Sequence, residues 1–78
     1  MMTRKHFEMI AASIKAEVDR LRAERDLFNK QGMTNRADSR VKLENGVYLA
    51  TCRIAQAFAK ENPRFDHRRF LTACGFDQ

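Results

Sequence analysis

The sequence predicts an all-α fold, a long antiparallel helical hairpin followed by a short C-terminal helix. Three observations carry this prediction. Apolar residues recur at helical spacing through residues 7–28, a second apolar stretch ends at Pro63, and the segment after that proline has the signals of a helix start and a helix end. At 78 residues the chain is expected to form one helical domain, residues 1–78.

The first helix is expected over residues 4–30, with Thr3 at its N-cap and Gly32 suited to its end. Opposite charges four residues apart support its exposed faces; these pairs are Lys15–Asp19, Arg20–Glu24, Arg22–Asp26 and Asp26–Lys30. One narrow apolar stripe follows its length and consists of Phe7, Ile10, Ile14, Val18, Leu21 and Phe28.

The second helix is expected over residues 35–61, capped by Thr34. Asn45-Gly46 between alternating residues is also a strong hairpin signal, so a β-hairpin and a kink at residues 45–46 both stay open. The helix is favoured because a lone two-stranded hairpin is marginal in water. Its apolar residues fall on two sides, which indicates a helix covered on two faces. They are Ala37, Val41, Tyr48, Cys52, Ala55 and Ala59, and on the other side Leu43, Val47, Ala50, Ile54 and Ala57.

The closing segment predicts a short helix over residues 67–74. Asp66 is a preferred N-cap, and Phe65 and Phe70 have the spacing of a hydrophobic staple. Gly75 suits a left-handed C-terminal cap, and a closing apolar contact from Phe76 to Leu71 or Phe70 is expected. The polar side of this segment consists of Arg64, His67, Arg68 and Arg69. It is either a solvated face or a site for a phosphate or carboxylate.

The composition argues against several classes of function. The sequence has no nucleophile–base set, no glycine-rich phosphate loop and no metal-ligand spacing, so we expect no catalytic residues, no metal and no cofactor. Cys52 and Cys74 are expected to be buried apolar residues, with a disulfide as the alternative. No apolar run is long enough for a membrane span, and a cytoplasmic protein is expected.

Two stretches resemble the ends of a group of small, mostly uncharacterised proteins of bacteriophages, prophages and plasmids. These stretches are Thr-Arg-Lys-His-Phe at residues 3–7 and Asn-Pro-Arg-Phe-Asp-x-x-Arg-Phe-Leu-x-Ala-Cys-Gly at residues 62–75. The resemblance covers about a quarter of the chain. It implies an origin in a mobile element and a bacterial host cell, and it carries over no catalytic residues.

A non-enzymatic inhibitor is therefore expected, one that binds a host protein or ribonucleoprotein complex and blocks it sterically, as anti-CRISPR proteins do. The net charge of +5 suits an acidic partner, and a small nucleic-acid-binding protein is the alternative. A homodimer that forms a four-helix bundle also stays open. The expected partner-binding residues are Arg64, His67, Arg68 and Arg69 with Arg20, Arg22 and Arg25.

Overall fold

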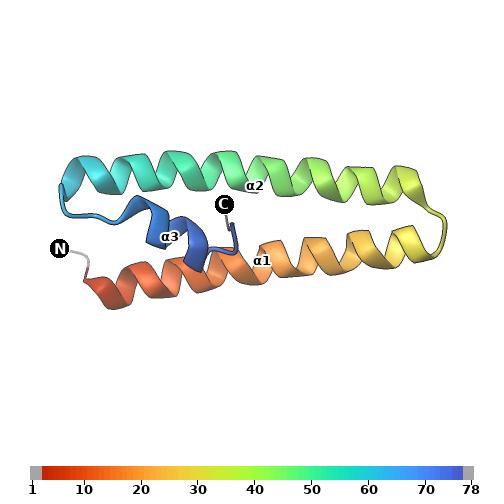
Figure 1. Cartoon of the computed structure of the whole chain (residues 1–78), viewed down its shortest axis with the longest axis horizontal. Helices are drawn as coiled ribbons and strands as arrows, with labels where there is room; N and C mark the ends of the chain where they lie inside the picture. Colours follow the sequence, from red (N-terminus) through yellow and green to blue (C-terminus); the bar gives the residue numbers. More distant parts are fainter. Residues whose placement is uncertain (1–2, 77–78) are drawn as a thin grey trace.

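A computed structural model of the chain describes residues 3–76, and residues 1, 2, 77 and 78 lie outside the described part. The chain forms α1 (Arg4–Lys30), α2 (Thr34–Glu61) and α3 (His67–Ala73) in this order. Figure 1 shows α1 and α2 lying antiparallel, with α3 between them near the start of α1 and the end of α2. The molecule measures 46 × 19 × 18 Å. The predicted all-α hairpin with a short C-terminal helix is confirmed.

The turn between the two long helices is built by Gly32. Its φ of 75° is in the left-handed region, where glycine has no steric penalty. The Gly32 N–H donates to the carbonyl oxygen of Asn29 at 3.1 Å, and the Met33 N–H donates to that of Phe28 at 2.8 Å. These two bonds form a Schellman motif, which ends α1 two residues before the glycine as the sequence predicts.

The second helix begins one residue earlier than expected. Thr34 is its first residue and Met33 occupies the N-cap, so the prediction that Thr34 caps the helix is wrong. The Schellman turn is the physical reason. It closes at Met33, whose carbonyl oxygen already accepts the Ala37 N–H at 3.0 Å, so the chain enters the next helix at once.

Asn45 and Gly46 lie inside α2, which is unbroken from Thr34 to Glu61. The β-hairpin alternative is therefore wrong, and residues 3–76 contain no strand. Glycine costs a helix about 1 kcal/mol relative to alanine. Packing on both sides of Gly46 offsets that cost, because Glu44 pairs with α1 and Val47 packs against the core.

The core lies along the seam of the hairpin and under α3. Val18 and Ala55 are fully buried on the two long helices, and Phe70, Cys74 and Phe76 bury the closing segment against them. Where the closing segment covers the seam, the core consists of aromatic side chains. Four phenylalanine rings pack there edge to face or tilted, with centroids 4.8–5.7 Å apart, and they are Phe7, Phe58, Phe65 and Phe70.

The half of the hairpin near the turn is held by polar contacts as well. Arg22 pairs with Glu44, and Arg40 Nε donates to Glu24 Oε1 at 2.5 Å. The Arg40 guanidinium also lies 5.0 Å from the centroid of the Phe28 ring. Of the four ion pairs expected along α1, Lys15–Asp19 and Arg20–Glu24 form. The expected Arg22–Asp26 and Asp26–Lys30 pairs are not among the ion pairs of residues 3–76.

Candidate functional site

The closing segment is fixed by contacts at both ends of α3. At its start, the Asp66 carboxylate accepts the backbone N–H of Arg69 at 3.0 Å, and the rings of Phe65 and Phe70 lie 5.5 Å apart. This is the capped and stapled start that the sequence indicates. The segment 62–66 that leads into α3 is itself held by a turn, because Asn62 Oδ1 accepts the Arg64 N–H at 3.0 Å.

At its other end, α3 closes on Gly75, whose φ is 94°. The Gly75 N–H donates to the carbonyl oxygen of Thr72 and the Phe76 N–H to that of Leu71, both at 3.0 Å. This second Schellman motif ends the helix at Ala73, one residue before the expected end. The Phe76 side chain packs edge-on against Tyr48 of α2, with ring centroids 5.0 Å apart.

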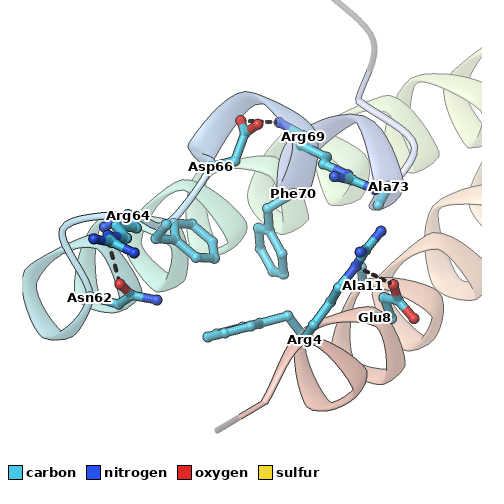
Figure 2. A pocket seen from close by; sticks show the side chains of 11 residues that line it. Arg4, Glu8, Ala11, Asn62, Arg64, Asp66, Arg69, Phe70 and Ala73 are labelled. Carbon is cyan, nitrogen blue, oxygen red and sulfur yellow. Dashed lines mark hydrogen bonds and ion pairs between the residues drawn. The ribbon is translucent and has the colours of Figure 1, made fainter.

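The first turn of α1 and the closing segment meet in space. Phe7 from the first turn of α1 lies 5.2 Å from Phe65 of the closing segment, measured between ring centroids. An open pocket of about 340 Å³ lies beside this contact, between the start of α1, residues 62–66 and α3. Phe7, Phe65 and Phe70 are the aromatic residues that line it, and Figure 2 shows the Phe70 side chain reaching into it from α3.

Three arginines line the same pocket. Arg4 and Arg69 lie near Ala73, and Arg64 lies at the other end, beside Asn62 (Figure 2). Arg4 Nε donates to Glu8 Oε1 at 3.1 Å, so its charge is balanced locally. The side chains of Arg64 and Arg69 form no ion pair with any acid in residues 3–76. The pocket therefore combines an aromatic wall with two unpaired cations.

The other polar residues of the closing segment face a different side. His67 and Arg68 line a second hollow, together with Tyr48 and Cys52 of α2. The four residues expected to act as one cluster are thus divided by α3. Arg64 and Arg69 line the pocket beside α1, whereas His67 and Arg68 lie beside α2.

The three arginines of α1 that the sequence assigned to a partner are engaged within the chain. Arg20 contacts both Glu17 and Glu24, and its hydrogen bond to Glu17 lowers the pKa of that carboxyl. Arg22 pairs with Glu44 and also donates to the Gly75 carbonyl oxygen at 3.0 Å. Arg25 pairs with its neighbour Asp26. None of the three lines the pocket.

Residues 3–76 contain no cluster of three or more His, Cys, Asp or Glu residues that could hold a metal ion. Cys52 and Cys74 are both free thiols. Cys74 is buried as predicted, and burial raises the pKa of its thiol to about 11, so it is a weak nucleophile at neutral pH. Cys52 is only half-buried, so the prediction that it is a buried apolar residue is met in part.

The expected partner-binding residues did not include Arg4, Phe7 and Asn62. All three lie in the stretches at residues 3–7 and 62–75, on which the expectation of a mobile-element origin rests. Their convergence could not be read from spacing, because the pocket joins residues at opposite ends of the chain.

Comparison with protein-family models, curated proteins and solved structures finds no match to this chain. None of the helices in residues 3–76 has the length and apolar composition that a membrane-spanning helix requires. The pocket and the basic residues around α3 are therefore the features that bear on function.

Proposed function

We propose that this chain is a small non-enzymatic binding protein that docks on an acidic patch of a partner protein complex through the pocket beside α3. One observation carries the proposal: the side chains of Arg64 and Arg69 have no acidic partner in residues 3–76, and they flank an aromatic wall. Arginine binds carboxylates through paired N–H donors, and protein interfaces are enriched in arginine and aromatic residues.

The neighbouring acids do not satisfy these two arginines. The Glu8 carboxylate accepts from Arg4, and the Asp66 carboxylate accepts the backbone N–H that caps α3. An acidic side chain of a partner would therefore find free guanidinium donors. A large apolar side chain next to it would contact Phe7 or Phe65, both of which are half-buried at the pocket wall.

A protein of this kind would inhibit its partner by occupying part of the partner's surface. The pocket offers arginine and phenylalanine side chains for binding, and the two carboxylates that line it, Glu8 and Asp66, are engaged by Arg4 and by the backbone of α3. The resemblance of the chain ends to mobile-element proteins makes a bacterial defence complex, including a CRISPR effector, the partner to test first. An inhibitor of such a complex would act in the cytoplasm of the bacterial host.

Nucleic-acid binding is the second candidate, favoured by the net charge of +5. Unpaired cations also lie outside the pocket; in residues 3–76 they include Arg53, Lys60 and Arg68. The two candidates differ in their dependence on salt, because binding to phosphates releases counterions and weakens steeply as salt rises. Docking that includes apolar contacts weakens less.

The test is capture of partners from bacterial lysate by the tagged chain, at low and high salt and with and without nuclease, followed by mass spectrometry. The variant Arg64→Ala/Arg69→Ala should lose a captured protein partner at least tenfold. The matched control Arg53→Ala/Lys60→Ala removes two exposed cations that do not line the pocket and should retain the partner. Recovery of nucleic acid alone, lost at high salt, would contradict the proposal and support the second candidate.

A further inference from the structure

Two lines of residues run side by side along α2, and we call them the covered seam and the outer seam. α1 and the closing segment pack mainly over the covered seam. The covered seam includes Glu44, which pairs with Arg22, the buried Thr51 and Ala55, and Phe58, which stacks on Phe7. The other seam lies one residue earlier along the helix at every step. It consists of Leu43, Val47, Ala50, Ile54 and Ala57.

This outer seam has the spacing of a helix–helix contact. Its members follow one another by four, three, four and three residues, which is the heptad spacing that pairs α-helices side by side. Two of its five members are alanines, and Gly46 lies next to it, so a second helix could approach closely. The spacing is regular over two heptads, whereas scattered surface apolar residues have no such period.

Val47 alone of the five seam residues packs against the core of residues 3–76. Leu43 is 53% exposed and Ile54 is 37% exposed, Ala50 and Ala57 are exposed, and only Val47 is half-buried. The closing segment lies on the opposite flank of α2, where Cys52 lines a hollow with residues of α3. Ile54 follows Cys52 by two residues, which places it about 160° away around the helix. Figure 1 likewise shows α3 beside the hairpin over only part of its length.

The exposed area fits a second copy of this chain. The molecule exposes 5909 Å². A folded monomer of 9.1 kDa is expected to expose about 4,900 Å², so the excess is about 1,000 Å². A standard dimer interface removes roughly 600–1,000 Å² from each partner. The excess surface of this elongated hairpin is thus of the size that one self-association would bury.

We infer that the outer seam of α2 is a homodimer interface, and that two hairpins pair across a two-fold axis into an antiparallel four-helix bundle. A two-fold interface joins the same patch on both copies, so each seam residue is used twice. The half-buried Ile10 and Ile14 of α1 pack against the same core as Val47, and they extend the apolar face toward α1. The pocket beside α3 lies outside this seam, so dimerisation would leave it open on each copy.

The test is sedimentation velocity of the full chain from about 1 to 200 µM, with Ile54→Lys, Leu43→Lys and the control Leu49→Lys. Leu49 lies on the same helix and is 62% exposed, but it is outside both seams. The wild type and Leu49→Lys should sediment as dimers. Ile54→Lys and Leu43→Lys should each raise the dimer Kd by roughly 100-fold or more, because each adds two buried charges to the interface.

Circular dichroism distinguishes a variant that has lost the dimer from one that has lost its fold. The lysine variants should retain the helical signal of the wild type, because Leu43 and Ile54 are exposed in the hairpin itself. Their melting temperature should lose the dependence on protein concentration that a dimer confers. A wild type that is monomeric at every concentration would overturn the inference. So would a dimer that survives both seam substitutions or is lost in Leu49→Lys.

Discussion

Arg22 Nη1 donates a hydrogen bond of 3.0 Å to the carbonyl oxygen of Gly75, which joins the middle of α1 to the end of the closing segment. The same side chain pairs with Glu44 of α2, and its guanidinium lies 6.0 Å from the centroid of the Phe76 ring. One arginine therefore connects all three parts of the fold. Arg22 lies next to the contact between α1 and α2, within reach of Glu44, which explains why it does not pair with Asp26 along its own helix.

Replacement of Arg22 should therefore destabilise the fold. We expect Arg22→Met to lower the free energy of unfolding by about 1–2 kcal/mol, because it removes a charge-assisted hydrogen bond and leaves Glu44 without its partner. Arg22→Lys should recover only part of the loss, because lysine lacks the planar fork of donors. Urea denaturation measures both. Arg53→Met, at an exposed and unpaired position, should stay within about 0.5 kcal/mol of the wild type.

Phe70 connects α3 to the aromatic cluster. It is 5% exposed and stacks on Phe58 and Phe65. Phe70→Ala should cost about 3–5 kcal/mol, enough to abolish the cooperative thermal transition of so small a domain. Leu49→Ala removes a side chain that is 62% exposed and should leave the transition nearly in place. An unchanged melting temperature for Phe70→Ala would show that α3 does not stabilise the hairpin.

Substitution of Gly46 by alanine and of Gly75 by alanine should have opposite effects on stability. Gly46 lies inside α2 with no atom within 4 Å of an added Cβ, so Gly46→Ala should stabilise the chain by about 0.5–1 kcal/mol. Gly75 has a φ of 94°, so Gly75→Ala should destabilise it by about 1–2 kcal/mol. Thermal melts of both variants measure whether each change raises or lowers the stability. Destabilisation by Gly46→Ala at a concentration where the chain is monomeric would indicate that residues 45–46 are not helical.

The two cysteines should differ in reactivity. At pH 7 Cys52, which is half-buried, should react with a thiol reagent such as dithiobisnitrobenzoate much faster than Cys74. Cys74 is buried and its pKa is raised to about 11, so little thiolate is present and the reagent cannot reach it. The variants Cys52→Ser and Cys74→Ala separate the two rates. In denaturant the rates should converge; equal rates in the native state would contradict the burial of Cys74.

Glu24 should make stability depend on pH in the acid range. Its hydrogen bond from Arg40, followed by that from Arg20, lowers the pKa of its carboxyl below the ordinary 4.5. A carboxyl with a lowered pKa stabilises the native state fully above its unfolded pKa. That contribution is lost as the pH falls from about 4.5 through the lower native value. Urea midpoints measured from pH 6 to pH 3 should fall less steeply for Glu24→Gln than for the wild type.

The sequence by itself determined the helices and their ends. Glycine at residues 32 and 75, aspartate at 66 and proline at 63 act on the backbone within a few residues, so their effects could be read locally. Two local signals failed. Thr34 is the first residue of α2 rather than its N-cap, because the preceding turn closes at Met33. Asn45-Gly46 lies inside α2, where packing against α1 overcomes the cost of a glycine in a helix, about 1 kcal/mol.

Only the tertiary structure decided which charges remain free. Arg22 and Arg40 each have an acid four residues further along their own helix, yet they pair with Glu44 and Glu24 on the other helix. Arg64 and Arg69 form no ion pair within residues 3–76, and they line one pocket because α3 folds back onto the first turn of α1. Charge pairing and burial depend on distances between residues far apart along the chain. Those distances exist only after the two long helices and the closing segment have packed together.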